Sequence, residues 1–255
     1  MTSPIDFRLR VLGSNGTYPT PGRPASGYLV SGGGTTVLLD VGPGVAMALQ
    51  QAVDPGDLDA IVISHVHPDH CSDVFAVFNI YRYGPGSRRG IPVFVPDGAA
   101  EHLASFVRAE PGHELFSVFD FRTVQPGDRA RVGALDLAFG AAVHPIPSLV
   151  TAVECEGRRI VYTGDTGPGS EAGAMSRGAD LLLSEATYQG EPDPQRWPYH
   201  LLASEAGELA GAAGVARLVV CHVAPVLDPQ RSVAEAAAVF DGPVAWAEPG
   251  WETRI

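Results

Sequence analysis

Short apolar runs alternate with amphipathic segments along the whole chain. Runs of β-branched and aliphatic residues bounded by glycine or proline predict strands, and apolar residues three or four positions apart predict helices. We therefore expect strands at 7–12, 27–31, 35–41, 58–64, 92–95, in strand-like segments up to 144, in a hairpin over 151–162, and at 180–185, 218–221 and 244–247. We expect helices at 43–52, 73–82, 99–109, 204–213 and 231–240, with Ser204 as the N-cap of its helix.

The order of these elements suggests an architecture. Strands precede helices twice along the chain, which favours two sheets packed together with helices outside. The periodicity alone also fits a doubly wound sheet, so it does not decide between the two. No linker or low-complexity run divides the sequence, and residues 1–255 are expected to form a single domain.

Composition narrows the class of protein. Hydrophobic residues make up 45% and charged residues 18%, which is typical of a globular chain. Acidic residues outnumber basic ones by 29 to 17, for a net charge of −12. So negative a chain disfavours non-specific binding of nucleic acid, which needs many Lys and Arg contacts to phosphate. A small phosphate-bearing substrate stays compatible, because bound cations reverse the local field.

Two further features bear on location. No apolar run approaches the roughly 20 residues that span a bilayer, and the first residues lack the basic start and apolar stretch of a signal peptide. The cysteines Cys71, Cys155 and Cys221 are odd in number and have no CxxC spacing, which argues against a disulfide framework. The expectation is a cytoplasmic protein without membrane association.

The strongest chemical signal follows the apolar run 58–64. It is the segment His65-Val66-His67-Pro68-Asp69-His70. Imidazole suits Zn, Fe, Ni and Cu, and a carboxylate adds a harder oxygen ligand that is able to bridge two ions. Four metal-competent side chains in six positions favour a metal site over a solvated polar loop or a helix cap.

One such segment cannot complete two coordination shells, so partners must come from other strand ends. His144, Asp165 and His222 each lie where an apolar strand gives way to a loop. Asp165 is flanked by glycines, which permit close approach of the backbone. Taken alone, each of these residues is more typical of a structural role in a turn or at a strand end. Their combination with the first cluster indicates a second set of ligands.

In order and type, these seven side chains resemble the ligand set of the metallo-β-lactamase superfamily. The resemblance implies an α/β fold, the four-layer αββα metallo-β-lactamase sandwich, with two divalent metal ions. It places one ion on His65, His67 and His144, a second on Asp69, His70 and His222, and Asp165 as a bridge between them. Zinc is the first expectation for both ions, with manganese or iron as alternatives.

Three further segments resemble the tRNase Z-like phosphodiesterases of that superfamily. They are a Glu-Ala-Thr element at 185–187, a segment beginning at His200 ahead of a helix, and a Pro-Thr-x-x-Arg loop ending at Arg23. The resemblance implies that His200, held by Glu185, assists the departing oxygen, a role that suits the pKa of imidazole. The alternatives are a surface histidine at position 200 and a solvated Arg23 rather than a phosphate contact. Ser148 is a further candidate for substrate contact, from the loop after His144.

The sequence also departs from the tRNA-processing enzymes. They carry a long arm that grips tRNA, whereas the corresponding segment 83–90 is too short. The net charge of −12 argues against large RNA as well. The chain is more similar to short bacterial members that cleave small phosphodiesters, including cyclic nucleotides.

The expected reaction is hydrolysis of a small phosphodiester by a hydroxide that bridges two metal ions, with Asp69 as both ligand and orienting group. Three alternatives stay open: tRNA 3′-end endoribonuclease-like cleavage, hydrolysis of an ester, thioester or lactam on the same metals, and a metal-binding regulatory or assembly role without turnover.

Trp197, Pro198 and Tyr199 either line the mouth of the site or pack in the interior. A homodimer is possible, but no stretch of sequence predicts it.

Overall fold

A computed structural model describes residues 6–84, 87–193 and 195–255. The first five residues, on which the expectation about a targeting segment rests in part, lie outside the described residues. So do residues 85–86, within the segment compared with the tRNA-gripping arm. In the part of the chain that is described, no helix is both long and apolar enough to cross a membrane.

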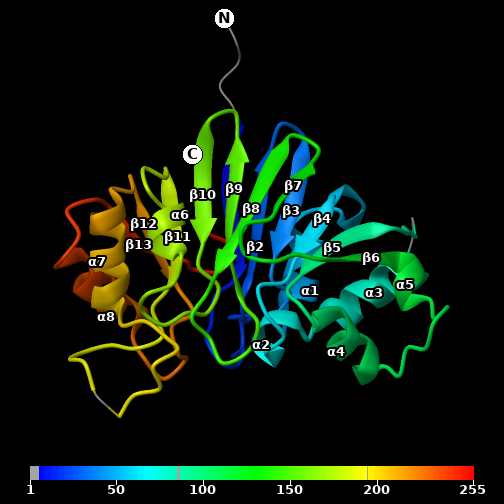
Figure 1. Ribbon diagram of the computed structural model, residues 1–255, viewed down its shortest axis with the longest axis horizontal. Helices are drawn as coiled ribbons and strands as arrows, with labels where there is room; N and C mark the ends of the chain where they lie inside the picture. The colour runs from blue at the N-terminus through cyan, green and yellow to red at the C-terminus, as the bar shows by residue number, and fades with distance from the viewer. Residues whose placement is uncertain (1–5, 85–86, 194) are drawn as a thin grey trace, which may run out of the picture.

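Two mixed seven-stranded sheets pack face to face (Figure 1). The first contains, in spatial order, β14 (Glu252–Arg254), β1 (Arg8–Gly13), β2 (Gly27–Gly32), β3 (Thr35–Leu39), β4 (Ala60–Val62), β5 (Ile91–Val95) and β6 (Phe119–Thr123). The second contains β13 (Val244–Trp246), β12 (Leu218–Cys221), β11 (Leu181–Glu185), β10 (Arg158–Tyr162), β9 (Leu149–Cys155), β8 (Leu135–Ala141) and β7 (Arg129–Val132).

Helices cover the outer face of each sheet, as Figure 1 shows. Against the first sheet lie α1 (Val45–Ala52), α2 (Pro68–Cys71), α3 (Val74–Tyr83), α4 (Ala99–Phe106) and α5 (Leu115–Val118), with a short 3-10 turn at Pro55–Asp57. Against the second lie α6 (Ala172–Met175), α7 (Ala203–Ala213) and α8 (Pro229–Ala237). The four-layer α/β sandwich expected from the sequence is therefore confirmed.

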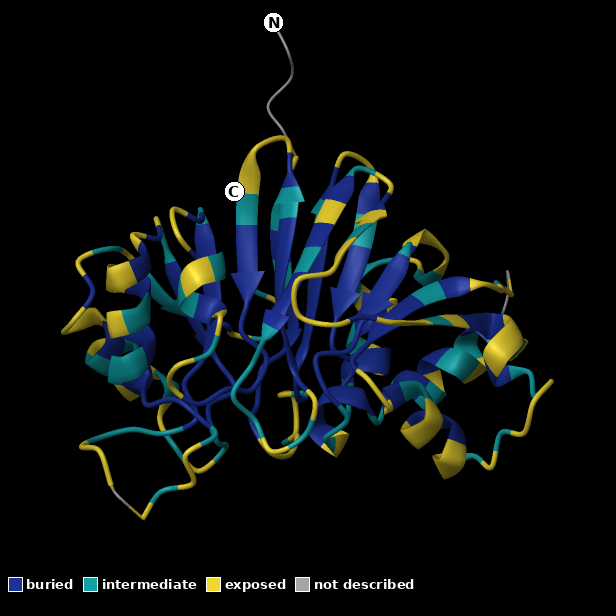
Figure 2. Ribbon diagram, in the orientation of Figure 1, coloured by how far each residue is buried: buried dark blue, intermediate teal, exposed yellow. Residues whose placement is uncertain are grey.

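The period of the strands explains how the layers separate. In β11, Leu181 and Leu183 pack into the core between the two sheets, whereas Leu182 packs against the helices outside. Successive strand residues point to opposite faces, so a strand covered on both sides is apolar throughout. Figure 2 shows the result as buried strands between partly exposed helices and exposed loops.

Some predicted boundaries are wrong. Ser204 is not an N-cap: α7 begins at Ala203, and the cap position is Leu202, whose backbone N–H donates to the Glu205 carboxylate at 2.8 Å. A glutamate three residues into the helix thus does the capping. The last helix is shifted as well. It runs from Pro229 to Ala237, because Asp228 caps it by accepting a hydrogen bond from the backbone of Gln230.

The strands bring the candidate residues to one edge of the sandwich, the lower edge in Figure 1. Strands β10, β11 and β12 are parallel neighbours, and so are β3, β4 and β5. The carboxyl ends of parallel strands meet at the same edge, where loops are free to carry functional side chains.

Candidate metal centre

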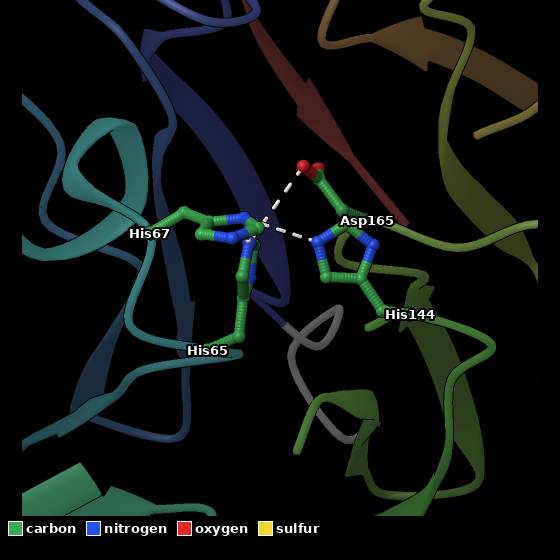
Figure 3. Close-up of side chains that lie close together, drawn as sticks. All are labelled: His65, His67, His144 and Asp165. Carbon is green, nitrogen blue, oxygen red and sulfur yellow. Dashed lines mark hydrogen bonds and ion pairs between the residues drawn. The ribbon is translucent and has the colours of Figure 1, made fainter. Parts of the chain in front are cut away.

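The first group of side chains joins both halves of the sandwich. His65 and His67 follow β4, His144 follows β8, and Asp165 follows β10. Their ligand-type atoms all lie within 4.8 Å of one another. The Nε2 atoms of His65 and His144 each lie 3.0 Å from Nδ1 of His67, and Asp165 Oδ2 lies 3.7 Å from His65 Nε2 (Figure 3).

A second group shares Asp165. It contains Asp69 and His70 from α2 and His222 from the end of β12. His222 Nε2 lies 3.1 Å from Asp69 Oδ2 and 3.4 Å from Asp165 Oδ2, and His70 Nε2 lies 3.2 Å from Asp165 Oδ1. Asp165 therefore faces both groups, the position that the family resemblance implies for a bridging ligand.

Among the described residues, two buried atoms of this cluster make no hydrogen bond: Nε2 of His70 and Oδ1 of Asp165, which lie 3.2 Å apart without the alignment of a hydrogen bond. A buried polar atom left unpaired is costly, so such atoms need an explanation. A divalent cation supplies one, because both are metal-ligand atoms and both belong to the second group. The donor set of imidazoles and carboxylates fits zinc, and also iron or manganese.

The protonation states agree with this fit. Burial lowers the pKa of His65 far below its ordinary value and that of His144 to about 4, so both are neutral at pH 7. Neutral imidazole is the form that binds metal. At His70, burial acts in the same direction, but the carboxylates of Asp165 and Asp40 outweigh it and raise the pKa. The carboxylates around His70 thus favour positive charge at the second group, which a divalent cation would also supply.

Access to the cluster is one-sided. His65, His70, Asp165 and His222 are buried, whereas His67 and His144 are partly exposed. The side of the cluster that carries His67 and His144 is therefore the one that solvent and substrate reach.

Asp40 is a functional candidate that the sequence analysis missed. It follows β3, is fully buried, and has a φ of 59°. Its carboxylate accepts hydrogen bonds from the Ser64 backbone, the Ser64 hydroxyl and the Tyr162 hydroxyl, and it lies 2.7 Å from His70 Nδ1. A carboxylate at Nδ1 fixes the imidazole tautomer and leaves Nε2 for the metal. An aspartate after an apolar strand was the available signal, the same one that pointed to Asp165.

Thr187 is a second missed residue. Its hydroxyl donates to Glu185 Oε2 at 2.7 Å and lies 2.8 Å from His222 Nδ1. It therefore orients His222 as Asp40 orients His70, and it joins the candidate ligand to Glu185. From the sequence, Thr187 could be named only as part of the Glu-Ala-Thr element, since the role of a hydroxyl depends on the side chains around it.

His200 and Glu185 form a buried pair beside the second group. Glu185 Oε1 lies 3.0 Å from His200 Nδ1, and Oε2 accepts the backbone N–H of Leu201 at 3.0 Å. The His200 ring stacks on that of His222, with centroids 5.6 Å apart. Burial lowers the pKa of His200, but the charge and hydrogen bond of Glu185 outweigh it, and the pKa is raised. The pair can hold and deliver a proton next to the cluster.

The two residues proposed for substrate contact are placed differently. Ser148 is buried in the loop that follows His144, where its hydroxyl donates to the Ile146 carbonyl at 3.0 Å. It lines a cavity of about 480 Å³ together with His144. Arg23 is exposed, and its guanidinium lies over the Trp246 ring, 5.1 Å from the centroid. Among the described residues, no hydrogen bond or ion pair joins Arg23 to the metal cluster. Its loop reaches the cluster through Thr17, whose N–H donates to Asp69 Oδ2 at 2.8 Å.

Metal removal should destabilise the fold. An ion that binds only the folded state adds RT ln(1 + [L]/Kd), about 2.7 kcal/mol at 100 times Kd. For a chain of this length we expect exhaustive chelation to lower Tm by about 5–10 °C, and zinc, manganese or iron to restore it. Differential scanning calorimetry with metal analysis of each sample checks this. An unchanged Tm in protein shown to have lost metal would contradict it.

Comparisons with known proteins agree with this geometry. A family model described as a beta-lactamase superfamily domain matches residues 35–223, a range that contains all seven cluster residues. The chain is 36% identical over 246 residues to uncharacterized protein ML1173 of Mycobacterium leprae, covering 94% of this chain and 86% of the relative. It is 30% identical over 294 residues to a ribonuclease Z of Kineococcus radiotolerans, covering 97% and 91%.

A solved structure is similar over the whole chain. YhfI of Bacillus subtilis, named a probable metallo-hydrolase, is 28% identical over 255 residues, covering 96% of this chain and 100% of YhfI. Its crystal structure, described as a metallo-beta-lactamase fold protein, superimposes with a TM-score of 0.87 at 25% identity, covering 99% and 100%. The similarity therefore includes both sheets and the edge that carries the cluster.

Proposed function

Because the chain belongs to the beta-lactamase superfamily, among the metallo-hydrolases of its tRNase Z-like branch, we propose that it is a phosphodiesterase with two divalent metal ions, zinc first. We propose a small phosphodiester such as a cyclic nucleotide as the substrate. The relative named ribonuclease Z supports phosphodiester cleavage in general. The net charge of −12 favours a small substrate over a large RNA.

The observation that carries the proposal is the His200–Glu185 pair. His200 Nδ1 lies 3.0 Å from Glu185 Oε1, and the ring stacks on the candidate ligand His222. Cleavage of a phosphodiester expels an alkoxide, which needs a proton when it leaves. With Nδ1 bound to Glu185, the Nε2 atom of His200 is available to give that proton.

The cluster and the side chains around it have separate tasks in this mechanism. Divalent cations held by the seven side chains would supply hydroxide near neutral pH and neutralise the charge that builds on the phosphate oxygens. Asp69 is held in place by the Thr17 N–H, while Asp40 and Thr187 fix the ring orientations of His70 and His222. Glu185 orients the His200 ring through Nδ1 and favours its protonated form, since its charge and hydrogen bond raise the pKa of that imidazole against the effect of burial.

Substrate profiling tests the proposal. We expect the metal-loaded protein to hydrolyse bis(p-nitrophenyl) phosphate and 3′,5′-cyclic AMP, with kcat/KM for these diesters at least about tenfold above that for nitrocefin or an acyl thioester. The same assay on a short tRNA precursor measures the endoribonuclease alternative. Turnover of the thioester or lactam without turnover of either diester would overturn the proposal. A metal-loaded protein that turns over none of them would favour a regulatory or assembly role.

A further inference from the structure

Trp197 lies on the accessible side of the cluster. Trp197 is 47% exposed, although tryptophan is usually among the more buried residues. Its ring centroid lies 5.9 Å from that of His144 and 5.4 Å from that of His200. The indole thus neighbours both a candidate metal ligand and the candidate proton donor, and it still offers surface to solvent.

The backbone that follows Trp197 is held in place. A Cβ added to Gly167 would lie 2.0 Å from the Pro198 carbonyl oxygen, so the two segments are in close contact there. The Tyr199 carbonyl lies 3.3 Å from His144 Nδ1, and the Tyr199 ring packs edge-on against the indole with centroids 5.3 Å apart. The exposed position of Trp197 is therefore built into the site and does not result from an unattached loop.

An exposed aromatic ring held next to a centre that we propose to bind a phosphodiester suits a ligand with a flat π face. Bases stack on aromatic side chains because every base has a flat π face. A nucleotide carries a phosphate ester and such a face a few ångströms apart, so it fits both features at once. We propose that the Trp197 indole is the stacking platform for the base of a nucleotide substrate whose phosphodiester lies between His144 and His200.

This inference rests on the proposed function and extends it to a specificity residue. A ring that served only to pack His144 and His200 would affect every substrate equally. A stacking platform affects only substrates that carry a base, and it affects their binding more than the chemical step.

The experiment compares matched substrates. We expect Trp197→Ala to raise KM for 3′,5′-cyclic AMP by about 10- to 100-fold, with kcat changed less than about threefold. We expect little change for the 3,5-cyclic phosphate of 1-O-methylribose, which has no base. Trp197→Phe keeps an aromatic face and should recover most of the affinity. Phe106→Ala, which removes an exposed aromatic ring from α4, is the control and should behave as wild type.

Binding without turnover separates this inference from the proposed function. Calorimetry with AMP and ribose 5-phosphate should show weaker binding of AMP alone in Trp197→Ala. That result supports the platform even if neither cyclic diester is hydrolysed. Equal losses for the base-free and base-containing ligands, or no loss for either, would overturn the platform while leaving phosphodiesterase activity intact.

Discussion

Asp69→Ala is expected to lower kcat/KM for phosphodiester hydrolysis by about three orders of magnitude or more. Asp69 belongs to the second group of candidate ligands, and its Oδ2 lies 3.1 Å from His222 Nε2. The nearby imidazoles of His222 and His70 hold its pKa below the ordinary value against the effect of burial, so it is an anion at every working pH. Alanine removes that charge from the centre and also removes the acceptor of the Thr17 N–H.

We expect the loss of activity in the Asp69 variants to come partly from lost metal and partly from a slower chemical step. Asp69→Asn keeps the acceptor for Thr17 without the charge, and we expect it to be nearly as inactive as Asp69→Ala. Asp57→Ala removes an exposed carboxylate from the turn before β4 and is the control. Steady-state kinetics and metal analysis are measured on each variant. Activity that survived Asp69→Ala unchanged would rule out the mechanism proposed above.

His200→Ala should show an effect that depends on the leaving group. General acid assistance contributes about 10²- to 10⁴-fold when the departing oxygen needs a proton, as the ribose oxygen of a cyclic nucleotide does. p-Nitrophenolate leaves readily without one. We therefore expect about a 10³-fold loss of kcat on 3′,5′-cyclic AMP and a much smaller loss on bis(p-nitrophenyl) phosphate.

The controls for His200 test competing roles. Glu185→Gln should lower kcat in the same selective way, because it removes the charge that raises the pKa of His200. His102→Ala, at an exposed position of α4, should have no effect. Glu185, His200 and His222 also lie close enough to hold an ion themselves. Equal losses on both substrates, together with lost metal, would identify His200 as a ligand instead of a proton donor.

The metal cluster could be predicted because its signal is local in part. His65 to His70 supplies four ligand-type side chains within one loop and a short helix. His144, Asp165 and His222 could be added only through the pattern they complete, since each alone resembles a turn or strand-end residue. The structure brings all seven together.

The sheet arrangement, the orienting residues and the helix cap could not be predicted, because they depend on tertiary contacts. Periodicity could not exclude a doubly wound sheet, because it reports which faces of a strand are buried and not which sheet buries them. Thr187 became visible only once His222 and Glu185 surrounded its hydroxyl. The N-cap of α7 was misplaced because Glu205, inside the helix, provides the cap. Arg23 stacks on Trp246, a partner that lies far away in sequence.

The split of the candidate ligands between the two sheets has a consequence for the whole molecule. Four of the seven follow β4 in the first sheet, three follow strands of the second, and Tyr162 donates to Asp40 across the gap. Neither half of the sandwich can assemble the centre alone. The affinity of the protein for metal ions should therefore depend on how closely the two sheets pack against each other. A cavity made deep between the sheets, at Leu183 for example, is expected to appear as weakened ion retention before the protein unfolds.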